Sequence, residues 1–171
     1  MNDINTTAED TQALSAGKAL LMLGAIIVFV GLFIALNFWV GIEDFWAGFL
    51  FILYWSTIEQ MNEQRLPHCI VGAVVGLLAA YALQTLPQIL GPYGLLIPMV
   101  AILVMIYCQL MGWVPVAVNT ATMLFLTVAT IPVLQAQGNF VSIFSGLGLG
   151  VAFFVTLMAG GSRLAAKFSK A

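Results

Sequence analysis

Six apolar segments follow one another along the chain, separated by short stretches with glycine, proline or charged residues. They cover residues 19–40, 45–58, 68–86, 93–110, 113–134 and 140–159. A helix that crosses a bilayer needs about 20 mostly apolar residues, and most of these segments approach or exceed that length. The second segment is shorter, because a helix over residues 45–58 would be about 21 Å long against a hydrocarbon core of about 30 Å. The pattern predicts an all-α membrane protein with six transmembrane helices.

The composition supports a membrane protein and excludes several other classes. Of the 171 residues, 62% are hydrophobic and 7% are charged, whereas a soluble domain has about 25% charged residues. No basic cluster indicates binding to nucleic acid. Cys69 and Cys108 form no spaced pair, so we expect packing residues rather than a disulfide or a zinc site. We therefore expect the protein to lie in the lipid bilayer. We expect no cofactor and no metal.

The positions of the basic residues predict the orientation. In a six-helix arrangement all five lie on the side that holds both termini: Lys18, Arg65, Arg163, Lys167 and Lys170. The opposite side carries Glu43 and Asp44 instead. Because Lys and Arg are enriched in cytoplasmic loops, we expect both termini in the cytoplasm. The predicted organisation is a polar cytoplasmic tail (1–18), a six-helix membrane domain (19–160) and a basic cytoplasmic tail (161–171), and the run 19–40 is interpreted as a retained span, not a signal peptide.

The two halves of the chain repeat each other at a constant offset of 74 residues. Trp39-Val40, Ala47, Leu50-Phe51, Gly72 and Gly76 recur as Trp113-Val114, Ala121, Leu124-Phe125, Gly146 and Gly150. The repeats would cover residues 19–86 and 93–160. A unit of three helices inserts its second copy upside down, and inverted repeats of this kind are common in transporters. The alternative is that two hydrophobic hairpins merely resemble each other.

Glycines four residues apart occur at equivalent places in the third and sixth segments. Gly72 and Gly76 form one pair, and Gly146 and Gly150 form the other. In lipid such pairs allow two helix backbones to approach closely. We expect contacts inside the protomer, where the third and sixth helices would meet; contacts between subunits are the alternative.

The fifth segment is the most polar and supplies the main candidates for a solute path. On one helix Asn119, Thr122 and Thr130 would lie within an arc of about 80°, which Thr120 and Thr127 extend to about 160°. One amide and four hydroxyls on one side suit a path for a neutral polar solute. Threonines in membrane helices also bond to the carbonyl four residues earlier. Asn119 has no such local backbone partner, so it must find one on another helix or in water. It is therefore the strongest single candidate.

Glu43 and Asp44 occupy the connection between the first and second segments. We favour a solvated turn in which an acidic residue caps the second helix. The alternative is a cation or proton site, if the short second segment enters only part of the bilayer. If both helices cross fully, the pair lies at the extracytoplasmic mouth of the path; in the alternative it lies nearer the interior of the membrane.

Each of the remaining polar residues has a structural interpretation, and some also have a functional one. Glu59 and Glu63 are spaced to extend the second helix into water, and His68 is expected at the interface, with proton coupling as the alternative. Tryptophan at positions 39, 46, 55 and 113 lies near segment ends, where interfacial anchors occur. No catalytic set of residues is present, so we do not expect an enzyme.

The stretch Phe45-Trp46-Ala47-Gly48-Phe49-Leu50 and the sequence Trp113-Val114-Pro115 resemble a family of small bacterial inner-membrane proteins called domain of unknown function 1097. The likeness covers most of the chain after residue 19, whereas the loop 59–65 and the polar amino-terminal tail depart from it. It implies a multi-pass protein of the bacterial inner membrane and lends no functional residues.

Together these features predict an inner-membrane channel or permease for a small polar solute. We expect a homo-oligomer, because 171 residues make a thin bundle around a pore. The alternative is a non-transporting accessory or scaffold subunit, in which the polar face of the fifth segment bonds to a neighbouring helix.

Overall fold

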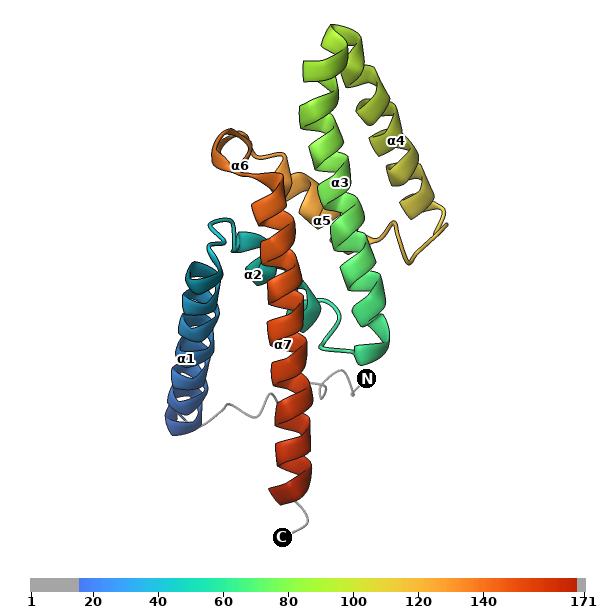
Figure 1. Ribbon diagram of the computed structural model, residues 1–171. Coiled ribbons are helices and arrows are strands. Elements are labelled where there is room, and N and C mark those ends of the chain that lie inside the picture. The colour runs from blue at the N-terminus through green and yellow to red at the C-terminus, as the bar shows by residue number, and fades with distance from the viewer. Residues whose placement is uncertain (1–15, 169–171) are drawn as a thin grey trace, which may run out of the picture.

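A computed structural model describes residues 16–168, and helices are the only regular elements in that range (Figure 1). The α-helices are α1 (Ala16–Val40), α2 (Trp46–Thr57), α3 (Leu66–Leu90), α4 (Leu96–Leu110), α5 (Thr120–Ala129), α6 (Pro132–Gln137) and α7 (Phe140–Phe168). Two 3-10 helices, η1 (Glu63–Arg65) and η2 (Gly91–Leu95), precede α3 and α4. The predicted all-α class is confirmed. The predicted tail 1–18 lies mostly outside the described residues, but α1 already begins at Ala16.

Three stretches are long and apolar enough to cross a membrane: Gly17–Val40, Glu63–Leu110 and Phe140–Met158. The middle stretch contains α3 and α4, which Figure 1 shows folded back on each other as a hairpin. The start of α1 and the end of α7 lie at the same end of the molecule (Figure 1). These features indicate a membrane protein, whereas six complete crossings and the cytoplasmic position of the termini stay predictions.

The second and fifth segments form shorter helices than the sequence suggested. The 12 residues of α2 and the 10 of α5 give lengths of about 18 Å and 15 Å. The prediction of a single helix over residues 113–134 was wrong. Residues 111–119 form turns, in which Gly112 and Val114 have positive φ angles of 67° and 50°. The proposed extension of the second helix through Glu59 and Glu63 was also wrong, since α2 ends at Thr57.

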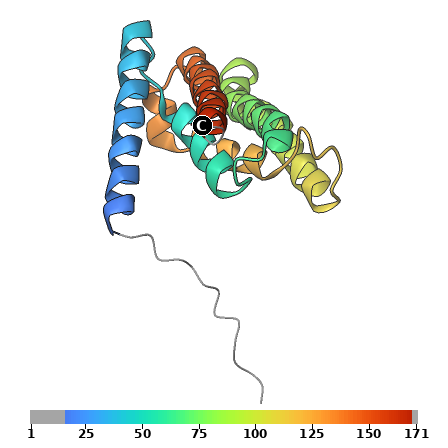
Figure 2. The ribbon, with the colours of Figure 1, turned by 90° about the horizontal axis from the view of Figure 1, so that it is seen from below.

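Each short helix packs against a long helix from the other half of the chain. The most extensive contacts join α3 to α5 and α2 to α7, and Figures 1 and 2 show α2 beside α7. The starts of these helices obey the same offset as the sequence repeat: Trp46 and Thr120 begin α2 and α5, and Leu66 and Phe140 begin α3 and α7. The halves therefore exchange their short helices.

Buried apolar side chains from α2, α3, α5 and α7 form one continuous core. Phe51 and Phe125, which occupy equivalent positions in the two halves, are both 0% exposed. Trp55 is also buried, stacks on Phe51 and donates through Nε1 to the Asn62 carbonyl. It is a core residue, so its prediction as an interfacial anchor was wrong.

The glycine pairs allow the short helices to approach the long ones. A Cβ atom added to Gly150 would lie 2.5 Å from Gly48 Cα, and one added to Gly146 would lie 2.5 Å from the Asp44 carbonyl oxygen. In the other half, the space beside Gly72 is filled by Asn119 and the space beside Gly76 by the backbone of Thr122. These contacts lie within the chain, but the partners are α2 and α5; the prediction that the third and sixth helices pack together through these glycines was wrong.

Helix α1 stands apart from the rest of the molecule. Most of its side chains are exposed, and Figure 2 shows it at the edge of the bundle and inclined to α7. Its main attachment is Phe33, which is 0% exposed and whose ring lies 5.0 Å from Phe49 and 5.1 Å from Phe154. An apolar surface on α1 is stable in lipid, where it needs no protein partner.

Candidate functional site

Polar side chains gather at the two ends of α2. Near its C-terminal end lies a group of contacts that we call the Asn119 junction, in which Asn119 bonds to the backbone of His68 and Tyr54 bonds to Glu59. Before its N-terminal end lies the Asp44 junction: Asp44, Asn139 and Ser142. Both junctions join segments that are far apart in the sequence.

Asn119 is the centre of the first junction, and it is not within a helix. It is the N-cap of α5: its Oδ1 accepts a hydrogen bond from the Thr122 backbone amide, and the Thr122 hydroxyl accepts one from the Asn119 amide. Its Nδ2 donates to the carbonyl oxygen of His68 in the first turn of α3 at 2.9 Å. Further acceptors are the carbonyls of Pro115 and Val116. The sequence predicted that Asn119 needs a hydrogen-bond partner on another helix or in water, and that partner is the backbone of α3.

Tyr54 and Glu59 complete this junction. The Tyr54 side chain is 2% exposed, and its hydroxyl donates to Glu59 Oε1 at 3.0 Å. Cys69 and Thr120 lie close to the same hydroxyl. His68 Nδ1 is buried without a hydrogen-bond partner. The sequence analysis did not identify Tyr54, because a tyrosine in an apolar run does not indicate which residue it bonds to. The only relevant signal was its spacing of five residues from Glu59.

The predicted threonine face does not form. Thr122 is fully buried and donates to the Ala117 carbonyl, whereas Thr120 and Thr127 are exposed. Thr127 bonds to the Met123 carbonyl four residues earlier, and Thr130 is the C-cap and bonds to the Thr127 carbonyl. Because α5 covers only part of the segment, the five residues do not share one side of a continuous helix; the prediction of that face was wrong.

The Asp44 junction holds the start of α7. Asp44 Oδ2 accepts from the Asn139 backbone amide at 3.1 Å, and the Asp44 amide donates to Ser142 Oγ at 3.1 Å. An acidic group at a helix N-terminus is favourable to the helix dipole. The predicted cap of the second helix was wrong, because the N-cap of α2 is Phe45 and no side chain caps it. Glu43 is exposed.

Asn37 is a polar residue that the sequence analysis missed. It lies in the last turns of α1, is 0% exposed and donates through Nδ2 to the Phe33 carbonyl at 2.8 Å. Its Oδ1 has no hydrogen-bond partner. A buried acceptor without a donor is costly in an apolar environment. A single amide in a run of 22 apolar residues was visible in the sequence, but its burial was not.

The region between the junctions is filled by the apolar core. Ala47 and Phe51 of α2 and Ala121 and Phe125 of α5 are all 0% exposed. Within residues 16–168, no group of three or more histidine, cysteine, aspartate or glutamate side chains is placed to hold a metal ion. The site therefore offers hydrogen-bonding groups at two ends of a dry core.

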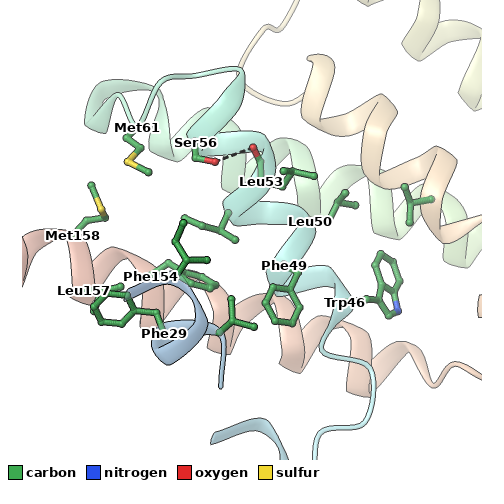
Figure 3. A pocket seen from close by; sticks show the side chains of 14 residues that line it. Phe29, Trp46, Phe49, Leu50, Leu53, Ser56, Met61, Phe154, Leu157 and Met158 are labelled. Atoms are coloured by element: carbon green, nitrogen blue, oxygen red, sulfur yellow. Dashed lines mark hydrogen bonds between the residues drawn. The ribbon is translucent and has the colours of Figure 1, made fainter. Parts of the chain in front are cut away.

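A separate groove of about 740 Å³ lies between α1, α2 and α7 (Figure 3). Its walls are mostly apolar side chains from these helices, together with Met61 of the loop after α2 and Val128 of α5. None of the residues predicted to line a solute path contributes to it. Such a groove favours a hydrocarbon rather than a polar solute.

Comparison of the chain with protein-family models, curated proteins and solved structures finds no match. The resemblance to domain of unknown function 1097 thus stays an expectation from the sequence.

Proposed function

We propose that the protein is a multi-pass protein of the bacterial inner membrane, built as two inverted three-helix repeats. The observation that carries this proposal is the exchange of the short helices, with α2 on α7 and α5 on α3. An exchange of equivalent elements is what a twofold axis between the halves produces. In Figure 1 α3 and α7 run in opposite directions, as inverted copies of one helix would.

Within that architecture, we propose a channel or permease for a small polar solute. Short helices with non-helical connections are tolerated at membrane depth where they are buried in protein or line a cavity, and transporters use them to form binding sites. The Asn119 and Asp44 junctions would form the two ends of the path. Phe51 and Phe125 would lie in its middle, and in this proposal their rings keep the path closed until the short helices move.

A second candidate is a non-transporting accessory or scaffold subunit. It is favoured by the hydrogen bonds of Asn119 and Thr122, all of which are made within the chain. In that case the junctions hold the fold together and Phe51 and Phe125 are ordinary core residues. A homo-oligomer is compatible with both candidates.

Solute flux into proteoliposomes distinguishes the two candidates. The purified chain is reconstituted, and shrinkage and recovery after an osmotic step with urea or glycerol are followed by light scattering. We expect recovery faster than in empty liposomes. Substituting Phe125→Leu, which shortens a side chain in the closed middle, should increase the rate further. Leu78→Ala removes atoms from a half-exposed side chain on α3 and serves as a control.

Equal rates for empty and protein-containing liposomes, with both the unsubstituted chain and Phe125→Leu, would contradict a channel. The same equality in the presence of pH and sodium gradients would contradict a coupled permease and leave the subunit as the better proposal. A circular-dichroism spectrum of each reconstituted variant verifies that it is folded.

A further inference from the structure

The groove between α1, α2 and α7 has the chemistry of a hydrocarbon site. Its walls include Phe29 and Val30 of α1, Phe49 and Leu53 of α2, and Phe154 and Leu157 of α7 (Figure 3). The one hydroxyl among the lining residues belongs to Ser56 and already donates to the Leu53 carbonyl. Of the polar side-chain atoms of these lining residues, only Trp46 Nε1 lacks a hydrogen-bond partner, so the walls offer a polar solute one donor at most.

The length of the groove matches one leaflet of a bilayer. It follows α2 from Trp46 toward Met61, and Figure 3 shows these residues at opposite ends, with Met158 beside Met61. The 12 residues of α2 extend about 18 Å, and half of the hydrocarbon core is about 15 Å deep. A single acyl chain would therefore fit along α2.

The methionine end of the groove has a basic residue on the α1 side, whereas Glu59 and Glu63 flank Met61 in the loop after α2. Lys18 lies two turns before Ile26, a groove residue, on α1. Beyond Met158, α7 continues to Phe168. The start of α1 and the end of α7 lie at the same end of the molecule (Figure 1). Basic residues near the membrane surface attract anionic lipids.

We propose that the groove binds one acyl chain of an anionic phospholipid, whose headgroup lies near Lys18. The lipid joins α1 to α2 and α7 across a space that protein side chains leave open. This inference does not depend on solute transport, because the groove contains none of the proposed path residues.

Quantification of co-purifying lipid tests this site. The full chain is exchanged into a lipid-free detergent and analysed by native mass spectrometry and by phosphate assay. We expect stoichiometric phospholipid, with phosphatidylglycerol retained over phosphatidylethanolamine when both are offered. Ser56→Phe should fill the groove and reduce retention several-fold. Thr57→Phe is the matched control, since Thr57 is the next residue, is exposed and bonds to the same Leu53 carbonyl. Lys18→Gln should abolish the preference for the anionic lipid.

Three results would overturn the proposal. The first is loss of all lipid from the unsubstituted chain, and the second is equal retention by Ser56→Phe and Thr57→Phe. The third is a dimer that Ser56→Phe dissociates and Thr57→Phe does not, because a second copy of the chain would then occupy the groove. A melting temperature for each variant distinguishes loss of lipid from loss of the fold.

Discussion

The side chain of Asn119 donates a hydrogen bond to the backbone carbonyl of His68, with 2.9 Å between Nδ2 and the oxygen. This bond ties the start of α5 to the first turn of α3. In the other half, Ser142 lies 74 residues after His68, and its hydroxyl accepts the Asp44 amide just before α2. Each connection that precedes a short helix is thus bonded to the start of the opposite long helix.

Replacement of Asn119 should destabilise the fold. Asn119→Ala removes the cap of α5 and the side-chain hydrogen bond to the His68 carbonyl, and loss of a cap alone costs about 1 kcal/mol. We expect a lower melting temperature in detergent, measured by tryptophan fluorescence. Asn119→Asp restores the acceptor for Thr122 but none of the donors, so it should recover only part of the loss. A melting temperature unchanged by Asn119→Ala would contradict the junction.

The effect of a glycine substitution on stability should depend on the position of the glycine along α7. Gly150→Ala places a Cβ atom 2.5 Å from Gly48 Cα and should destabilise the protein by about 1–3 kcal/mol. Gly148→Ala is the matched control, because nothing lies within 4 Å of its Cβ position. Replacing a helical glycine by alanine in open space should stabilise by up to about 1 kcal/mol. Equal effects of the two substitutions in thermal unfolding would contradict the packing of α2 on α7.

Of the two acidic residues before α2, we expect Asp44 to contribute to stability and Glu43 not to. Asp44→Ala removes the acceptor for the Asn139 amide and should cost about 1 kcal/mol. Asp44→Asn keeps an acceptor and loses only the charge, so a smaller loss is expected. Glu43→Ala should leave the melting temperature unchanged, since Glu43 is exposed. A larger effect at Glu43 than at Asp44 would show that Asp44 does not hold α7.

Replacement of Asn37 should not destabilise the fold. The Oδ1 atom of Asn37 is buried without a donor, and an unsatisfied buried group costs about 1–3 kcal/mol. Asn37→Leu has a similar size and removes that cost, so we expect an equal or higher melting temperature. A marked loss of stability would indicate that Oδ1 has a partner.

Much of the fold could be predicted from the sequence because membrane helices are encoded by apolar length. The apolar runs gave the helical class and the approximate positions of α1, α3, α4 and α7. The constant offset between the halves also anticipated that α2 and α5 begin at equivalent positions. These signals are local, since every backbone group within lipid must find its hydrogen-bond partner along its own segment.

The candidate site could be predicted only in part. Asn119 was recognised because an amide in an apolar run needs a partner, yet its role as a cap depends on the turns at Gly112 and Val114. The bond from Asp44 to Asn139 joins residues 95 positions apart, and no local pattern specifies it. The exchange of the short helices was equally invisible, because the glycine pairs indicate close packing without naming the partner.

Labelling of two equivalent positions tests the inverted arrangement most directly. Trp39 and Trp113 are 74 residues apart and are 85% and 53% exposed. In a chain with Cys69 and Cys108 replaced by alanine, Trp39→Cys and Trp113→Cys are treated separately with a membrane-impermeant maleimide in intact cells. Inverted repeats predict that Trp39→Cys is labelled from outside and that Trp113→Cys reacts only after the membrane is opened. Labelling of both positions from the same side would contradict the opposite insertion of the two halves.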